Sequence, residues 1–110
     1  MEKATQYELR LAERMSRMTS ATLSDRLRDD DSEMRRAAAL AVAMKEDTLH
    51  IPRLIELLDD SDMHVSRAAY AALKSLSGKD FGPRSKDASR AERAEAAAAW
   101  KSWWKEKGGK

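Results

Sequence analysis

Two histidines are the side chains best suited to acid–base or metal chemistry in this sequence. His50 and His64 are its only histidines. A helical zinc or hydrolase site would need further ligands at fixed spacing, as in H-E-x-x-H, and neither histidine has them. We therefore predict that both are surface residues without a catalytic or metal-binding role.

Two acidic clusters, at residues 29–31 and 59–62, could suggest calcium binding. An EF-hand loop needs Gly at its sixth position and Glu at its twelfth, and neither cluster has them. A carboxylate placed just before a helix accepts hydrogen bonds from the free N–H groups of the first turn. We therefore predict that Asp31 and Asp62 are helix N-caps. Two solvated turns also provide no pocket for paired catalytic carboxylates.

Composition and missing motifs exclude further function classes. The chain of 110 residues has no Cys, which excludes disulfides, Cys-ligated zinc and thiol catalysis. It contains no G-x-x-x-x-G-K-[ST] and no G-x-G-x-x-G, so a phosphate-binding loop has no support. The 21 basic and 19 acidic residues give a net charge of +2, which argues against a dedicated polyanion binder. The sequence therefore indicates a protein that is not an enzyme and needs no cofactor.

The same composition favours helices. Only four residues are Val or Ile, whereas Ala is abundant, which suits helix and disfavours sheet. No stretch approaches the roughly 20 apolar residues of a membrane span. The N-terminus lacks the apolar core of a signal peptide. We expect an all-α, cytoplasmic protein.

The chain repeats itself after 31 positions. On this shift Leu23 aligns with Leu54 and Leu27 with Leu58. Apolar residues at helical spacing predict a first helix, an acidic turn and a second helix in each unit. In the second unit, Pro52 fits the first turn of a helix and Gly78 fits a helix end. The buried stripes of the second helices are expected at Met34, Ala37, Ala38, Ala41 and Val42, and at Val65, Ala68, Ala69, Ala72, Leu73 and Leu76.

The string I-P-x-L-I-x-L-L-D-D-x-D-x-x-V at residues 51–65, followed by Ala68-Ala69 and Leu73, resembles a HEAT repeat. The short period is similar to that of the phycobilisome-lyase-type variety. The resemblance covers residues 20–76 in two units. It implies an α-solenoid that binds proteins and has no catalytic residue. The family pattern has an Arg directly after the Val, and in the family this Arg helps to link neighbouring units. Arg35 fits this position, but Ser66 departs from it, which puts the link at the last junction in question.

Two units need covered ends to be stable, because each repeat buries its apolar stripe only against neighbours. We therefore predict one domain, 1–110, with an N-terminal capping helix (5–19), repeat 1 (20–47), repeat 2 (48–78), a linker (79–88) and a Trp-rich C-terminal capping helix (89–106). Capping boxes are expected at Thr5/Glu8 and Ser89/Glu92. The inward stripe of the N-terminal helix is expected at Tyr7, Leu11, Met15 and Met18.

Phe81, Trp100, Trp103 and Trp104 are predicted to form the structural cap at the C-terminal end. Trp100 should be the deepest. Trp103 and Trp104 diverge by about 100° around the helix, so they should not be equally buried. The more exposed one is a candidate for homo-oligomer formation. Neighbouring lysines also suit a membrane interface or single-stranded nucleic acid, although neither is the expected partner.

A partner surface is predicted on the exposed faces of the second helices. Arginine, tyrosine and leucine side chains there would give the chemistry of protein-binding hot spots. The candidate residues are Arg36, Leu40, Arg67, Tyr70 and Lys74, with Ala39 and Ala43 between them. The predicted function is a non-catalytic protein–protein interaction or scaffold module. The alternative is binding of nucleic acid or an acidic surface through Arg35, Arg36, Arg67, Lys74 and the Lys-rich tail, which would weaken steeply with salt.

Overall fold

The computed structural model describes residues 6–109, and within this range the secondary structure is entirely helical. Capping residues mark where several of these helices begin or end. The helices are α1 (Gln6–Met15), α2 (Ser20–Arg26), α3 (Ser32–Lys45), the short 3₁₀ helix η1 (Thr48–His50), α4 (Ile51–Leu57), α5 (Met63–Ser77) and α6 (Arg90–Glu106). The all-α prediction is confirmed.

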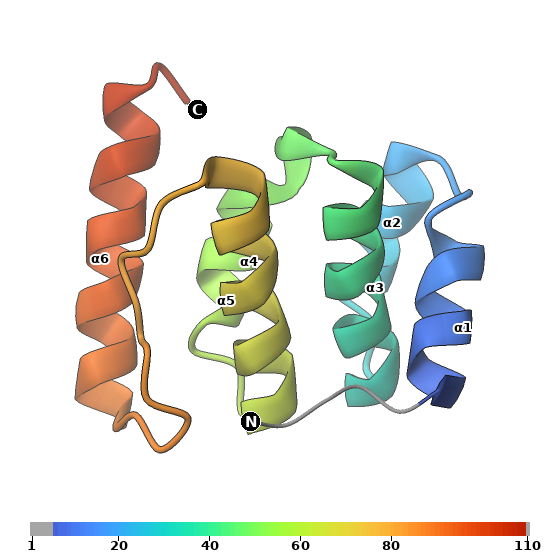
Figure 1. The fold of residues 1–110 in the computed structure, drawn as a ribbon, viewed down its shortest axis with the longest axis horizontal. Coiled ribbons are helices and arrows are strands. Elements are labelled where there is room, and N and C mark those ends of the chain that lie inside the picture. Colours follow the sequence, from blue (N-terminus) through green and yellow to red (C-terminus); the bar gives the residue numbers. More distant parts are fainter. Residues whose placement is uncertain (1–5, 110) are drawn as a thin grey trace.

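The helices stack side by side as an α-solenoid (Figure 1). α3 packs between α1 and α5, and these three helices form one layer. α2 and α4 lie behind them, and each forms a hairpin with the helix that follows it. α6 packs on α4 at the end of the stack opposite to α1, and the segment 79–88 runs between α5 and α6 (Figure 1). The predicted solenoid of helix pairs is therefore confirmed.

The predicted caps position these helices. The carboxylates of Asp31 and Asp62 accept hydrogen bonds from the backbone N–H groups of Glu33, at 2.9 Å, and His64, at 2.8 Å. Gly78 ends α5 with φ 71°, a left-handed conformation that suits glycine. Ser89 and Glu92 form the expected capping box at the start of α6. Thr5 lies outside the described residues.

The core follows the predicted periodicity. The leucines of both first helices, Leu23, Leu27, Leu54 and Leu58, are fully buried, and so is Leu73 of α5. The small residues of α3 and α5, which include Ala37, Ala38, Ala68 and Ala69, are buried where the two helices meet. Small side chains let helix backbones approach closely, so these alanines bring the two units into contact.

Two predicted orientations are wrong because α1 packs against α3. Ala39, expected on an exposed face, is fully buried, whereas Tyr7, expected to face inward, is 58% exposed. The inward face of α1 is formed by Ala12 and Met15, with Leu11 packed beside them. The sequence of α1 has apolar residues on more than one face of the helix, and the contact with α3 determines which face is buried.

The two repeat units are joined by a charged link at Arg35. Its guanidinium donates to both carboxylate oxygens of Asp60, at 2.9 and 3.1 Å, and to the carbonyl of Asp29 at 2.8 Å. The hydrogen bonds that Arg35 donates to the Asp60 carboxylate raise the pKa of Arg35 above its ordinary value. Ser66, at the equivalent position of the second unit, donates to the carbonyl of Leu58 at 2.7 Å, within its own unit. The junction between the second unit and the C-terminal part of the chain is therefore held by residues other than Ser66.

Candidate functional site

His50 is buried, not on the surface as predicted, whereas His64 is exposed. The Nε2 atom of His50 lies 3.1 Å from the Ser20 hydroxyl and 3.2 Å from an Asp47 carboxylate oxygen. Ser20 also donates to Asp47 at 2.7 Å. Burial acts to raise the pKa of Asp47, but hydrogen bonds from Ser20 and the Leu49 N–H hold it below its ordinary value.

This trio of Ser, His and Asp does not form a nucleophilic relay. A relay needs the carboxylate on one ring nitrogen and the hydroxyl on the other, whereas here both oxygen partners lie on Nε2. The trio instead ties the start of α2 to η1. In the sequence, only the spacing Asp47-x-x-His50 hinted at this contact. Among residues 6–109, no group of three or more His, Cys, Asp or Glu side chains could hold a metal ion.

The candidate partner residues on α3 are largely covered by α1. Arg36 forms an ion pair with Glu8 at 2.6 Å, and its side chain is only 16% exposed. Leu40 is half-buried and packs against the core. The second-helix face of the first unit is therefore a helix–helix contact.

The candidates on α5 lie together, but the segment 79–88 returns over them. Tyr70 is only 5% exposed, so the prediction of an exposed aromatic is wrong. Its hydroxyl donates to Asp80 at 2.7 Å. The Arg67 guanidinium and the Lys74 ammonium lie 5.3 and 4.9 Å from the centroid of the Tyr70 ring. Burial, reinforced by the Asp80 hydrogen bond, raises the pKa of Tyr70 to about 12.

Asp80 organises the linker. Besides Tyr70, its carboxylate accepts hydrogen bonds from the Gly82 N–H and the Arg84 guanidinium, each at 3.1 Å. The Tyr70 hydrogen bond is the largest cause that lowers the pKa of Asp80. Arg67 donates to the carbonyls of Pro83 and Arg84, at 3.3 and 3.4 Å. The linker is thus held on α5 by side chains of α5.

The tryptophans hold the other side of the linker. Trp100 is fully buried, as predicted, and its indole N–H donates to the Gly82 carbonyl at 2.7 Å. Phe81 is 37% exposed and meets Trp100 edge to face, with ring centroids 4.9 Å apart. Trp103 and Trp104 are both half-buried. Trp104 lines a hollow together with Pro52 and Ile55 of α4, the helix against which α6 packs. The aromatic residues therefore join the linker, α6 and α4.

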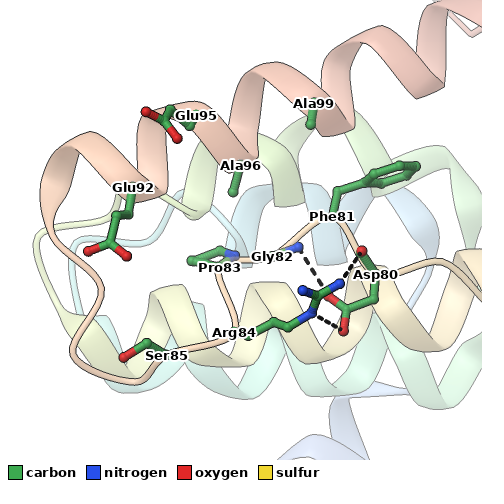
Figure 2. A pocket seen from close by; sticks show the side chains of 10 residues that line it. All are labelled: Asp80, Phe81, Gly82, Pro83, Arg84, Ser85, Glu92, Glu95, Ala96 and Ala99. Atoms are coloured by element: carbon green, nitrogen blue, oxygen red, sulfur yellow. Dashed lines mark hydrogen bonds and ion pairs between the residues drawn. The ribbon is translucent and has the colours of Figure 1, made fainter.

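A hollow of about 640 Å³ remains between the linker and α6 (Figure 2). We call it the linker–α6 groove. Apolar groups line one part of it, and carboxylates from α6 lie at its edge (Figure 2). The complete lining is Asp80, Phe81, Gly82, Pro83, Arg84, Ser85, Glu92, Glu95, Ala96 and Ala99.

The chemistry of this groove suits recognition better than catalysis. Its lining includes a serine but no histidine or other paired general base, so nucleophilic activation has no geometry there. Three carboxylates and one guanidinium line it, and the Arg84 guanidinium is already bound to Asp80. Glu92 is engaged in the capping box, whereas Glu95 has no ion pair with any described residue. The groove therefore offers an apolar floor with an acidic rim. No pattern in the sequence predicted this groove, since it forms only where the linker folds back.

Comparisons with known proteins bear on this architecture. A family model for HEAT repeats matches residues 20–101. A search of curated proteins and a search of solved structures each found no match. None of the helices in the described part of the chain is both long enough and apolar enough to cross a membrane.

Proposed function

Because the chain belongs to the HEAT-repeat family, we propose that it is a non-catalytic protein–protein interaction or scaffold module. HEAT repeats generally act in this way, and their stacked helices present extended surfaces to partners. The observation that carries the proposal is the linker–α6 groove, which combines an exposed aromatic edge with unpaired negative charge. We further propose that the repeats are units 20–47 and 48–78, of the phycobilisome-lyase-type variety, within one domain.

The groove has features that favour a protein ligand. Phe81 is half-exposed and is held in place by Trp100, so an incoming side chain would meet a preorganised ring. Preorganisation lowers the entropic cost of binding. Ala96 and Ala99 leave room beside this ring, and Glu95 supplies a negative charge at the rim. A basic segment with an apolar or aromatic anchor would fit this surface.

The residues predicted from sequence take two roles in this proposal. Lys74 is exposed on α5, so it can contribute contact area, whereas Leu40 of α3 packs against the core. Arg67 and Tyr70 act through the linker, because their hydrogen bonds fix the wall of the groove. Arg36 would contribute indirectly, because its ion pair with Glu8 holds α1 against α3.

The nucleic-acid alternative has weaker support. Arg35 is paired with Asp60, Arg36 is paired with Glu8, and Arg67 is bound to backbone carbonyls. Phosphate binding depends on cationic groups that are free to release counterions. Lys101, Lys105 and Lys107 of the tail remain exposed, but none of them lines the acidic linker–α6 groove.

Affinity capture with three forms of the protein tests the proposed surface. Wild type, Glu95→Arg and the control Asp25→Arg would be immobilised, and the retained proteins would be identified and quantified by mass spectrometry. Both substitutions replace an exposed acidic residue on a helix with Arg. We expect at least one partner that is retained by wild type and by Asp25→Arg but is lost with Glu95→Arg. An identical set of proteins on all three forms would contradict the assignment of the groove.

A direct nucleic-acid titration separates the two functions. Single-stranded and double-stranded oligonucleotides would be titrated with the protein at 50 and 200 mM salt, and fluorescence anisotropy would be followed. We expect no saturable binding. Tight binding that falls steeply with salt would favour the alternative function.

A further inference from the structure

The outer face of α1 carries a basic stripe at the end of the stack farthest from the linker–α6 groove. Tyr7, Arg10, Arg14 and Arg17 follow one another at spacings of three and four residues, which places them on one side of the helix and its extension. These residues, with Glu13, line a shallow hollow on that side. The stripe therefore combines an aromatic ring with three guanidinium groups.

This face has no neighbour within the described part of the chain. Tyr7 is 58% exposed, and the three arginines are exposed as well. None of the three forms an ion pair with another described residue. The opposite face of α1, formed by Ala12 and Met15, is the one that packs into the core. Among residues 6–109, the stack thus ends in a helix whose outer surface no other segment covers.

The two ends of the molecule are complementary in charge. The basic stripe carries Arg10, Arg14 and Arg17 against the single carboxylate of Glu13, which leaves two positive charges. The linker–α6 groove carries Asp80, Glu92 and Glu95 against the single guanidinium of Arg84, which leaves two negative charges. Each end also holds one exposed aromatic ring, Tyr7 or Phe81.

We propose that copies of this chain associate head to tail, with α1 of one copy seated on the linker–α6 groove of the next. This inference rests on the proposed function, since it takes the groove as a protein-binding surface and names its partner as a second copy. An antiparallel approach of α1 to α6 brings Arg10 and Arg14 opposite Glu95 and Glu92. The same approach carries Tyr7 one turn further, to the apolar part formed by Ala99 and Phe81.

The spacing along both helices permits this pairing. Arg10 and Arg14 are about 6 Å apart along the axis, and Glu92 and Glu95 about 4.5 Å apart. Guanidinium side chains are long enough to absorb the difference. A parallel approach would instead bring Tyr7 to the carboxylates and the arginines to the apolar part.

The contact joins different surfaces of the two copies, so each copy retains one free groove and one free stripe. Such a heterologous contact adds copies one after another unless the rotation between copies closes a ring. One helix face is a small interface, and exposed charges are screened by salt. Association is therefore expected at high protein concentration and low ionic strength.

Sedimentation velocity over a concentration series tests the proposal. At low salt, the weight-average sedimentation coefficient of the wild type should rise with concentration, and it should rise less at 0.5 M salt. Arg14→Glu and Glu95→Arg should each weaken self-association at least tenfold. The controls Arg28→Glu and Asp25→Arg make the same charge changes on the exposed surface of another segment, and they should behave as wild type. Circular dichroism would verify that every variant is folded.

Mixing distinguishes head-to-tail contact from any other contact. Arg14→Glu keeps an intact groove and Glu95→Arg keeps an intact stripe, so an equimolar mixture should form a one-to-one complex that does not grow. A chain that combines Arg10→Glu with Glu95→Arg should regain self-association, because these two positions face each other in the proposed contact and the exchanged charges again attract.

Three results would overturn the proposal. The first is a wild type whose sedimentation coefficient is independent of concentration at low salt. The second is self-association that both single variants retain, which would place the contact elsewhere, for example at Trp103 and Trp104. The third is a mixture of the two variants that forms no complex. The proposed function would survive any of these results if the capture experiment still yields a partner that depends on Glu95, and it fails separately if that experiment yields none.

Discussion

Trp100 links three parts of the structure through one side chain. It is fully buried, it donates its indole N–H to the Gly82 carbonyl, and it contacts both Phe81 and Trp103. A large aromatic side chain buries roughly 150–250 Å², and an edge-to-face neighbour adds further attraction. The linker wall of the groove therefore depends on this residue.

We predict that Trp100→Ala lowers the free energy of unfolding by about 3–5 kcal/mol, because it leaves a large cavity. Trp100→Phe should cost less, about 1–3 kcal/mol, since it keeps a ring but leaves the Gly82 carbonyl without its donor. The exposed neighbour Lys101→Ala is the control and should change stability by less than about 0.5 kcal/mol. Urea unfolding followed by circular dichroism measures all three. A Trp100→Ala protein as stable as Lys101→Ala would contradict the assigned role.

Burial of Tyr70, together with its hydrogen bond to Asp80, makes stability depend on pH at the alkaline end. The pKa of Tyr70 is raised to about 12 in the folded protein from an ordinary value near 10. A raised pKa means that folding favours the protonated hydroxyl. The stabilisation is therefore complete below about pH 10 and is lost as the pH rises from there towards 12.

Tyr70→Phe removes this titration. We predict that wild type exceeds Tyr70→Phe in unfolding free energy by a constant amount between pH 7 and 9, and that this difference shrinks above pH 10. Denaturant unfolding of both proteins at each pH gives the difference. Tyr7→Phe, at an exposed position, is the matched control and should show no such trend. A difference that stays constant to pH 11 would contradict a Tyr70 pKa raised by burial and by the Asp80 hydrogen bond.

At the scale of elements, α6 serves as the cover for the last repeat. α4 contacts α5 on one side and α6 on another, and Trp104 lines a hollow together with Pro52 and Ile55. Terminal repeats of a solenoid expose an apolar flank unless another element covers it. The short α4, with buried Ile51, Leu54, Ile55 and Leu57, has too few residues to be stable in isolation.

Deleting residues 88–110 should therefore yield an unfolded or aggregating chain. The apolar flank of α4 would be exposed, and the linker would lose the Trp100 contact. A matched truncation that removes only residues 108–110 leaves α6 complete and should remain helical and well behaved. Circular dichroism and size-exclusion chromatography with light scattering would follow both. A helical, non-aggregating protein from the longer deletion would refute the role of α6 as a cover.

At the scale of the whole molecule, the two junctions of the stack use different chemistry. Arg35 and Asp60 join the first unit to the second through paired hydrogen bonds, and both side chains are largely buried, at 14% and 8% exposed. The second unit joins the C-terminal part through Tyr70, Arg67 and Trp100, which all bind the linker. Position 66 holds Ser in place of the Arg of the family pattern, and contacts from the linker and the tryptophans hold this junction instead.

Arg35→Ala should lower the free energy of unfolding by about 2–4 kcal/mol, because it leaves the Asp60 carboxylate covered and without its partner. Arg26→Ala breaks a more exposed pair with Asp29 and should cost no more than about 1 kcal/mol. Thermal and urea unfolding of the two variants would give the comparison. If both substitutions lowered the free energy of unfolding by the same small amount, the junction would be held by apolar packing alone.

Local patterns in the sequence determined the helices and most of the core. The caps at Asp31 and Asp62, the helix end at Gly78 and the buried leucines of the first helices all depend on residues within one or two turns. Capping and helical periodicity are short-range effects, so they can be read without knowing the fold. The repeat in the sequence likewise indicated that equivalent helices would stack.

Tertiary structure decided which helix faces remain free and where a partner surface forms. The linker buries Tyr70, α1 covers Arg36, and contact between α2 and η1 buries His50. Each of these contacts depends on how a segment outside the repeat pattern folds against the helices, and the repeat pattern does not specify this. The linker–α6 groove exists for the same reason, since its two walls meet only after residues 79–88 have folded back. Helical periodicity predicts an apolar face for each helix, but only the packing of non-repetitive segments determines which of the other faces are exposed.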